Sequence, residues 1–354
     1  MSFCIKTKKS SGEIIRQFLT ERNLLSTIYK IKVELDSLII PITRDLTNEE
    51  IDELKDTGMN FEITRDDSLE LTKKSPSSHV EILEKILLED ELEFIPRSFD
   101  TIGDIVVVEI PDKLWEKKTV VGQSLLDAHS SIKSVYVKLG KVSGVNRIRP
   151  VEYLVGEKKT RAIYKEHGCR FMVDIEKAYF SPRLSEEHKR IANKVKAKET
   201  IADLFCGIGP FVIPIAKEVE SEIYAIDINS NAIELLKENI TLNKLKGKII
   251  PLCGDCRLVI KEQKLEGIAD RAIMNLPGYA INFIDVACSV LKPSGGIIHF
   301  FEFVRGKNPE ETIVEDLKKE ISKNNRKVKK ILEVKKVRMS APRQWQMVVD
   351  AFIE

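Results

Sequence analysis

The chain has 354 residues, of which 43% are hydrophobic and 32% are charged, and this composition suits a globular protein of two or three domains. No apolar run approaches the roughly 20 residues that a membrane helix needs, the N-terminus has no hydrophobic signal core, and the cysteines are scattered. These features exclude a membrane-spanning helix and a small disulfide-bonded secreted fold, and we expect a cytoplasmic protein; the net charge of +2 does not by itself point to nucleic acid.

Residues 1–72 are predicted to form a small α+β domain. Apolar periodicity and alternation predict its elements in order: a helix over 13–25, strands over 28–34 and 37–42, and a helix ending near 58. Thr47 and Glu50 have the spacing of a capping box at the start of that last helix. Acidic and basic residues nearly balance, so an accessory protein-binding module stays open as an interpretation, and residues 72–78 have the composition of a linker.

Residues 79–178 are predicted to form a second α+β domain. Its expected elements are a helix over 79–92, a strand over 104–110, a mostly helical stretch over 111–130, and antiparallel strands over 134–139, 151–155, 161–164 and 169–173. One segment of this domain carries basic residues and no acidic ones: Lys133, Lys138, Lys141, Arg147 and Arg149. This asymmetry suits an RNA phosphate backbone, although a solvated sheet edge has the same composition.

Residues 179–354 alternate between strand-like and helix-like segments, which predicts a doubly wound α/β sheet. The expected strands cover 201–205, 222–227, 248–253, 270–274 and 295–301, the expected helices cover 185–196, 211–216, 229–243 and 309–322, and an antiparallel pair covers 329–337 and 344–352. The fold class is therefore a Rossmann-like sheet with an antiparallel C-terminal edge, preceded by two smaller α+β domains. Residues 317–338 hold ten Lys/Arg against two Glu, which fits either a solvated face or a surface that steers RNA.

A glycine turn follows the first strand of this sheet, at Gly207 and Gly209. A dinucleotide fingerprint needs a third glycine three residues later, but Val212 stands there, which weighs against a pyrophosphate-binding dehydrogenase. S-adenosylmethionine has no phosphates, so its site needs close backbone approach and carboxylates. The sequence therefore favours S-adenosylmethionine.

Three acids follow successive strands and are the candidate carboxylates, although each alone is an ordinary strand-end acid. Asp203 is expected to order the turn near the methionine part, Asp227 to accept the ribose hydroxyls, and Asp255 to accept the adenine amino group. Ile228 and Cys256, which come directly after two of these acids, are assigned to the same site.

Asn275-Leu-Pro277 ends the fourth strand, where an amide oxygen and rigid carbonyls can hold a planar base. Cys253 and Cys256 form the only CxxC pair, so no four-ligand zinc site is expected and no metal is predicted. There is also no proline-cysteine nucleophile of the kind that methylation at C5 of a pyrimidine needs.

Several motifs in order and spacing carry a resemblance to a known family: Ser98-Phe-Asp-Thr-Ile-Gly-Asp-Ile105, Gly156-Glu-Lys-Lys-Thr160, Tyr179-Phe-Ser-Pro-Arg-Leu184 and Asn275-Leu-Pro277. Over residues 94–354 the chain resembles the archaeal and eukaryotic tRNA (guanine-37-N1)-methyltransferases, and its N-terminal unit fits the archaeal members.

The resemblance implies roles for single residues. Arg147 would hold guanine O6, Glu187 would be the general base, Asn275 would orient the base, and Tyr179 would lie in the active site. Four more residues are predicted to bind the substrate: Pro277, Lys138, Lys141 and Arg149. An arginine commonly follows the general base and touches the cofactor; His188 stands there in this chain.

The chemistry fits these residue types, because guanine N1 carries a proton at neutral pH and its removal builds negative charge on O6. The expected activity is transfer of a methyl group from S-adenosylmethionine to N1 of guanosine 37 in tRNA, by a monomer whose N-terminal unit contacts the tRNA body. Two alternatives remain: an enzyme that also methylates the wyosine intermediate made from the same guanosine, and a non-catalytic RNA-binding protein.

Overall fold

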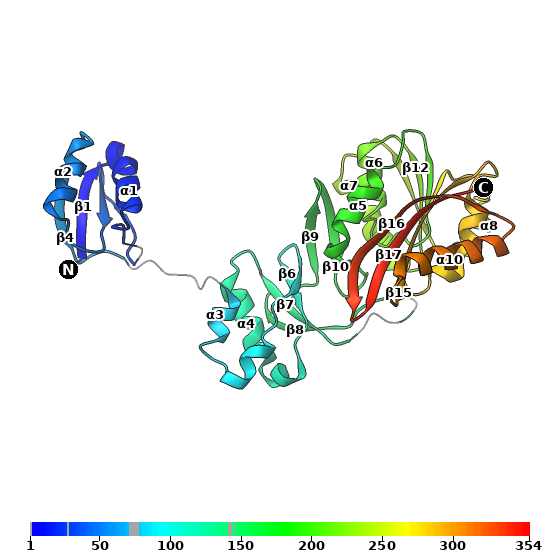
Figure 1. Ribbon diagram of the computed structural model, residues 1–354, viewed down its shortest axis with the longest axis horizontal. Helices are drawn as coiled ribbons and strands as arrows, with labels where there is room; N and C mark the ends of the chain where they lie inside the picture. Colours follow the sequence, from blue (N-terminus) through cyan, green and yellow to red (C-terminus); the bar gives the residue numbers. More distant parts are fainter. Residues whose placement is uncertain (1, 27, 71–77, 141–143, 145) are drawn as a thin grey trace. The chain divides into compact units, whose positions relative to one another are not determined.

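The computed structural model describes residues 2–26, 28–70, 78–140, 144 and 146–354 (Figure 1). The chain divides into two compact units, Met1–Ser77 and Ser78–Glu354. Among the helices in the described ranges, none is both long and apolar enough to cross a lipid bilayer.

The first unit is a four-stranded antiparallel sheet in the order β2-β3-β1-β4, with two helices. Its main elements are β1 (Ser2–Lys8), α1 (Gly12–Glu21), β2 (Lys32–Val33), β3 (Ser37–Pro41), α2 (Asn48–Asp56) and β4 (Phe61–Asp66). Ile15 and Leu19 of α1 pack with Ile5 and Ile40 of the sheet.

The predicted capping box at the start of α2 is confirmed. Thr47 Oγ1 accepts from the Glu50 amide at 3.3 Å, and Glu50 Oε2 accepts from the Thr47 amide at 2.8 Å. The strand predicted over residues 28–34 was too long, because only Lys32–Val33 pairs with β3.

The second unit begins with a mixed four-stranded sheet in the order β5-β6-β7-β8. Its elements are α3 (His79–Leu83), η2 (Glu89–Phe94), β5 (Phe99–Ile102), β6 (Ile105–Val108), η3 (Asp112–Lys117), α4 (Lys118–Ala128), β7 (Ser134–Lys138) and β8 (Val151–Gly156). The single helix predicted over residues 79–92 was wrong, since α3 ends at Leu83 and a 3₁₀ helix follows. β6 and β7 are parallel because α4 crosses over between them.

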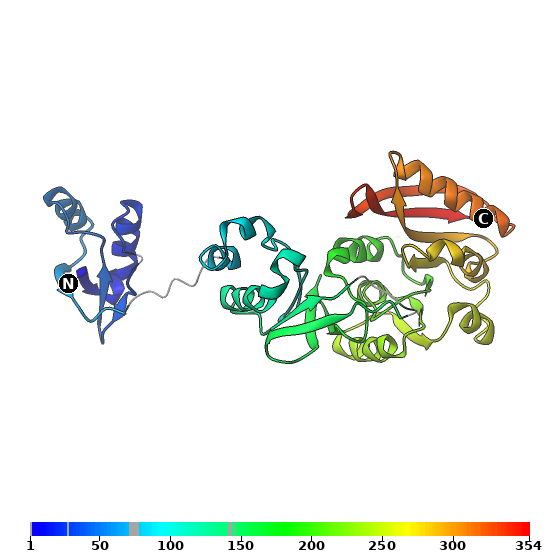
Figure 2. The ribbon, with the colours of Figure 1, turned by 90° about the horizontal axis from the view of Figure 1, so that it is seen from below.

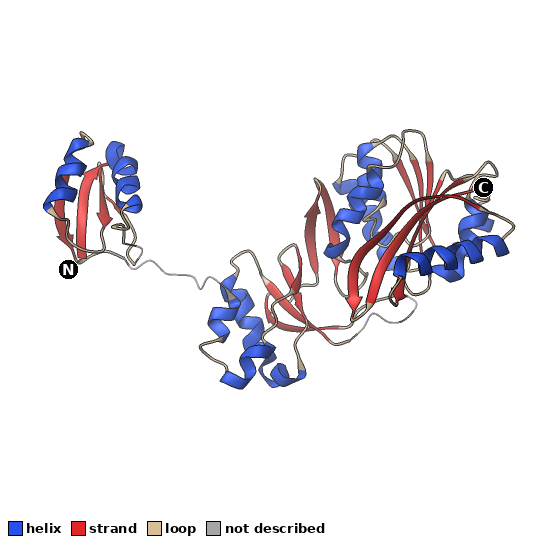
Figure 3. Ribbon diagram, in the orientation of Figure 1, coloured by secondary structure: helices blue, strands red, loops and turns tan. Residues whose placement is uncertain are grey.

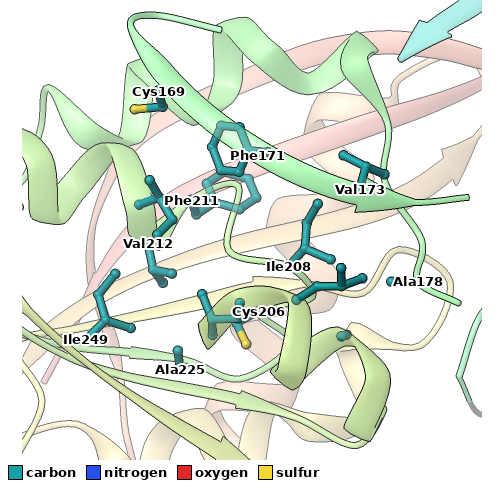
Figure 4. Close-up of a cluster of buried hydrophobic side chains, with 14 of the residues drawn as sticks. Cys169, Phe171, Val173, Ala178, Cys206, Ile208, Phe211, Val212, Ala225 and Ile249 are labelled. Atoms are coloured by element: carbon teal, nitrogen blue, oxygen red, sulfur yellow. The ribbon is translucent and has the colours of Figure 1, made fainter. Parts of the chain in front are cut away.

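β9 (Arg161–Glu166) and β10 (Cys169–Asp174) form an antiparallel hairpin, which confirms the predicted antiparallel strands, and this hairpin is a two-stranded sheet separate from β5–β8. Phe171 and Val173 of β10 belong instead to the core between the large sheet and its helices, as Figure 4 shows. Asn239 of α7 fixes the hairpin, because its Oδ1 accepts from the Met172 amide at 2.6 Å.

The large sheet has seven strands in the order β13-β12-β11-β14-β15-β17-β16 (Figure 3). Its strands are β11 (Thr200–Asp203), β12 (Glu222–Asp227), β13 (Lys248–Cys253), β14 (Arg271–Asn275), β15 (Gly296–Arg305), β16 (Val328–Ala341) and β17 (Gln344–Ile353). The first five are parallel, and β17 lies antiparallel between β15 and β16. The Rossmann-like sheet with an antiparallel C-terminal edge is thus confirmed.

Helices cover both faces of this sheet. The helices on one face are α5 (Ser185–Ala192), α6 (Val212–Glu218) and α7 (Ser230–Leu242), and those on the other are α8 (Cys256–Glu262), α9 (Ile284–Val290) and α10 (Pro309–Lys323). Figure 2 shows α10 lying along the β16–β17 hairpin. The strand order reverses beside β11, and in such sheets ligands bind at the carboxyl ends of the strands near that point.

Candidate active site

A cavity of about 260 Å³ opens at the carboxyl ends of β11, β12 and β14. Its wall combines the glycine turn after β11 with strand-end residues, with the segment from Tyr179 to Leu184, and with Arg147, which lies between β7 and β8. Asn275 and Pro277 line the same cavity. Residues predicted to bind the cofactor and residues predicted to bind the substrate therefore line the same cavity.

The glycine turn is tied to the end of the neighbouring strand. Gly207 and Gly209 have φ of +53° and +94°, a region that favours glycine. A Cβ on Gly209 would lie 2.5 Å from Leu236 Cδ1. The Gly207 amide donates to Asp227 Oδ2 at 2.7 Å, which fixes the turn against β12.

The three strand-end acids have different surroundings. Asp227 and Asp255 line the cavity, whereas Asp203 is fully buried behind the turn. Asp203 Oδ1 accepts from the Phe205 amide at 3.2 Å, and its Oδ2 has no hydrogen-bond partner among the described residues. Burial raises the pKa of Asp203 to about 8, and it also raises the pKa of Asp227. Asp255 Oδ1 caps α8 by accepting from the Arg257 amide at 2.8 Å.

The residues next to these acids also reach the cavity wall. Ile228 is exposed there, and Cys256 lines the wall although it is nearly buried. Burial raises the pKa of the Cys256 thiol to about 12, so it remains protonated at neutral pH. Within the described ranges, no cluster of His, Cys, Asp and Glu has the arrangement of a metal site.

The acid-lined end of the cavity fits S-adenosylmethionine. Asp227 and Asp255 line this end with carboxyl groups, and the positive φ of Gly207 and Gly209 allows the backbone to approach a ligand closely. The Asn275 Oδ1 atom is buried and has no partner among the described residues, so it is a free acceptor for a ligand.

Arg147 lies at the opposite end, beside the Asn-Leu-Pro turn. Its Nη2 donates to the Pro277 carbonyl at 3.2 Å, and its guanidinium carbon lies 5.7 Å from the centre of the Tyr279 ring. Tyr179 is partly exposed on the same wall.

Glu302 on β15 holds this turn from behind, and the sequence did not reveal it. Its carboxylate accepts from the amides of Gly278 and of Ile281, the latter at 3.4 Å. Burial raises the pKa of Glu302, while hydrogen bonds from backbone amides and the charge of Arg147 act in the opposite direction.

Glu187 lies in the first turn of α5 and is only 2% exposed. Its Oε1 accepts from Lys335 Nζ at 2.6 Å, and its Oε2 accepts from Arg190 Nε at 2.7 Å. Glu187 is not part of the cavity wall, although its neighbour His188 is. The carboxylate is therefore adjacent to the cavity but engaged by two cations.

His188 stands where the resemblance leads us to expect an arginine, and it lines the cavity. Its Nδ1 lies 2.7 Å from Glu166 Oε1, and its ring meets the Phe211 ring edge-on with centroids 4.7 Å apart. His188 is buried and fixed, so it can only present one edge to the cavity.

Two of the predicted phosphate-binding residues, Lys138 and Arg149, lie outside the cavity wall. Lys138 Nζ is paired with Asp100 Oδ2 at 2.6 Å, and Arg149 Nη1 donates to the Gly140 carbonyl at 3.1 Å. Both line a smaller hollow that shares Tyr179 with the main cavity. Lys141 lies outside the described residues.

Some cavity residues were missed by the sequence analysis: Phe205, Phe283, Phe303, Arg338 and Gln346. Arg338 and Gln346 come from the C-terminal hairpin, which lies four and three strands away from β11. Only the basic composition of residues 317–338 hinted at Arg338.

Comparison with known proteins identifies the family. The chain matches models of the tRNA methyltransferase 5 N-terminal domain over residues 4–50, the TYW2 N-terminal domain over residues 80–160, and the TRM5/TYW2 methyltransferase domain over residues 162–331. It is 39% identical to the tRNA (guanine(37)-N(1))-methyltransferase Trm5b of Methanocaldococcus jannaschii, over 99% of this chain and 98% of that protein.

Solved structures agree with this relationship. A complex of aTrm5 with tRNALeu is 36% identical and superposes with a TM-score of 0.78, over 99% of this chain and 100% of that chain. M. jannaschii TYW2 in complex with AdoMet is 33% identical with a TM-score of 0.57, over 73% of this chain and 99% of that chain.

Proposed function

The chain belongs to the archaeal tRNA (guanine(37)-N(1))-methyltransferase family, and from this premise we propose that it methylates N1 of guanosine 37 by using Glu187 and Arg147. The observation that carries this proposal is the single cavity that joins Asp227 and Asp255 to Arg147 and Asn275. When bound at the acid-lined end, S-adenosylmethionine supplies the methyl group.

We assign residues at the cofactor end to parts of S-adenosylmethionine by their capacity to form hydrogen bonds. Asp227 would accept the ribose hydroxyls and Asp255 the adenine amino group, while Gly207 and Gly209 permit close contact with the methionine part. Asp203 acts indirectly by ordering the turn, and Ile228, Cys256 and His188 complete the wall.

At the substrate end, Asn275 Oδ1 is free to accept a hydrogen bond from the edge of a guanine. Arg147 donates to O6 and stabilises the negative charge that develops there as N1 loses its proton. Pro277 and Tyr179 flank the base. The base must leave its stack to enter the cavity, because N1 is otherwise covered by neighbouring nucleotides.

Glu187 takes the N1 proton in this proposal. Arg190 and Lys335 hold the two oxygens of its carboxylate at 2.7 and 2.6 Å. Because the carboxylate lies behind the cavity wall, binding of the nucleotide must exchange the contact with Lys335 for a contact with N1–H.

The partner is tRNA, and we assign its wider contacts by charge. Arg149 is partly exposed and suits a phosphate, as does Lys141, whereas Lys138 already pairs with Asp100. The unit Met1–Ser77 would contact the tRNA body. We expect the protein to act as a monomer in the cytoplasm.

The test is methylation of two tRNA transcripts that differ only at position 37, G37 and A37, followed by mapping of the methylated atom. Methyl transfer to N1 of G37 alone is the expected result. Equal labelling of both transcripts, or of neither, would contradict the proposal.

A matched pair of variants tests the general base. Glu187→Gln should lower kcat by about 100-fold or more, in line with the usual contribution of a general base, and should leave the Kd for S-adenosylmethionine unchanged. Glu186→Gln is the control, because Glu186 is the adjacent residue and its side chain is 84% exposed. Equal kcat values for the two variants would show that Glu187 is not the general base.

A second candidate substrate is the wyosine intermediate, favoured by the match of residues 80–160 to the TYW2 N-terminal domain. Mass spectrometry of position 37 after incubation with tRNA that carries the tricyclic base separates the two substrates. A mass increase of one methyl group on that base would show that the enzyme also methylates the wyosine intermediate. An unchanged mass would exclude this activity. Family membership argues against the non-catalytic alternative.

A further inference from the structure

The C-terminal hairpin has an irregularity in the strand that faces the active site. Lys335 lies opposite Val348 and Lys336 lies opposite Met347, but the next residue of β17, Gln346, lies opposite Arg338. Val337 is therefore an extra residue in β16, a β-bulge. Bulges re-aim the side chains that follow them and are frequent beside active sites.

The bulge decides which face Arg338 occupies. In a regular strand, residues three apart point to opposite faces. The extra residue places Arg338 on the same face as Lys335, which contacts Glu187. Lys336 points to the other face, where its Nζ lies 2.6 Å from Glu310 Oε1 of α10.

Arg338 lines the active-site cavity and is oriented by a buried partner. Its Nε donates to Gln346 Oε1 at 2.8 Å, and Gln346 is 1% exposed and lines the same cavity. Neither Nη atom of Arg338 has a hydrogen-bond or ion-pair partner in the part of the chain that the structure describes. The four N–H groups of the two Nη atoms are thus left for a ligand.

The hairpin places these donors at the substrate end of the cavity. Gln346 pairs with Phe303 of β15, and the position of a Cβ on Gly278 lies 3.7 Å from the Phe303 ring. Gly278 follows Asn275-Leu-Pro277 directly. By contrast, Asp227 and Asp255 lie at the ends of β12 and β13, on the other side of β11 and β14.

We propose that Arg338 is a further substrate-contacting residue that binds a phosphate group next to the target guanosine, with Gln346 and the Val337 bulge as its positioning elements. The proposal rests on the proposed function. A nucleotide that is swung into the cavity brings its two flanking phosphates to the cavity mouth. A guanidinium with two free Nη groups matches a phosphate in charge and in geometry, and Arg147 already serves the base.

The experiment compares tRNA with and without a neutral methylphosphonate at the 5′ or the 3′ phosphate of G37. For the wild-type enzyme, neutralising one of these phosphates should raise KM about 10-fold or more, the effect of losing a charge-assisted contact. Arg338→Gln should raise KM for unmodified tRNA by a similar factor. For this variant, neutralising the phosphate should cause no further increase in KM. Gln346→Leu should reduce the same phosphate sensitivity, while Arg338→Lys should retain part of it.

Lys336→Gln is the matched control, because it removes a cation one pair away on the opposite face of β16. It should behave as the wild type on both substrates. The proposal is overturned if Arg338→Gln keeps full sensitivity to the neutral phosphate, if neither phosphate matters to the wild type, or if Arg338→Gln instead weakens binding of S-adenosylmethionine, whose carboxylate is the other anion in reach.

Failure of this proposal is distinguishable from failure of the proposed function. Wild-type methylation of unmodified G37 tRNA reports the function, and only the difference between variants on the neutralised substrate reports the role of Arg338. Thermal unfolding of each variant, measured by circular dichroism, identifies any variant that does not fold, and Arg338→Lys then provides the comparison.

Discussion

At the scale of single residues, burial determines how Asp203 supports the glycine turn. The carboxyl group is fully buried, holds the Phe205 amide through one oxygen, and has a pKa raised by burial to about 8. It is therefore largely protonated at neutral pH, and its role is to order the turn rather than to bind the cofactor by charge. The carboxylates that line the cavity come from Asp227 and Asp255.

This assignment predicts a definite dependence of stability on pH. The folded state keeps the Asp203 proton up to about pH 8, whereas the unfolded chain loses it near its ordinary pKa of 3.8. Between these values the folded state binds more protons, so the contribution of this group to stability falls as pH rises and levels off above pH 8. In thermal unfolding from pH 5 to pH 9, the Tm of wild type relative to Asp203→Asn should decrease up to about pH 8 and then level off; a constant difference throughout would contradict the raised pKa.

Glu302 is predicted to position the substrate loop. Its carboxylate holds the amides of Gly278 and Ile281, so Glu302→Gln loses part of this clamp and its charge next to Arg147. The KM for tRNA should rise about 10-fold, the size of one charge-assisted hydrogen bond, with little change in the Kd for S-adenosylmethionine. Calorimetry and steady-state kinetics check the two quantities, and a loss confined to cofactor binding would show that Glu302 serves the other end of the cavity.

At the scale of elements, a buried network joins α5 to the C-terminal hairpin. Asp350 of β17 accepts from Arg190 at 2.5 Å and from Lys194 at 2.6 Å, and it lies 2.6 Å from His299. Burial alone would raise the pKa of Asp350, but its hydrogen bonds with His299, Arg190 and Lys194 hold that pKa well below its usual value. Arg190 also donates to Glu333 of β16 at 2.9 Å, so the network joins the helix that carries Glu187 to both strands of the hairpin.

Removing the charge of Asp350, at the centre of this network, should destabilise the protein strongly. Asp350→Asn leaves Arg190 and His299 without their common carboxylate, and we expect a loss of about 3–5 kcal/mol in the free energy of unfolding. Because the pKa of Asp350 is lowered by folding, its contribution is present above its unfolded pKa and is lost as pH falls, so the two proteins should converge on acidification. Urea unfolding measures this, with the exposed pair of Glu354 and Lys329 as the control in Glu354→Gln.

Local patterns predicted most of the elements because they depend on neighbours in sequence. The glycine turn, the strands β11 to β14 and the capping box of α2 were all readable from periodicity and spacing. Pairing between distant segments was not readable. The β9–β10 hairpin forms a sheet of its own with β10 against α7, and Arg338 reaches the cavity wall beside a bulge in β16. Glu187 was predicted by resemblance, but its pairs with Arg190 and Lys335 depend on the tertiary fold.

At the scale of the whole molecule, the two units have separate hydrophobic cores. The clusters of the first unit contain residues up to Leu69, and the clusters of the second begin at Val80. Sequence composition predicted a boundary over residues 72–78, and the division falls at Ser77 and Ser78. The further boundary predicted near residue 178 remains a prediction, since the residues on both sides of it belong to one unit.

Separate cores predict separable functions. The fragment Ser78–Glu354 contains the complete cavity and should fold and bind S-adenosylmethionine with the Kd of the full chain. If the first unit contacts the tRNA body, its removal should raise KM for full-length tRNA about 10-fold, and it should leave KM unchanged for an anticodon stem-loop, which lacks that body. An equal effect on both RNAs would instead mean that the first unit acts at the anticodon. No effect on either RNA would favour the accessory protein-binding role that its balanced charge leaves open.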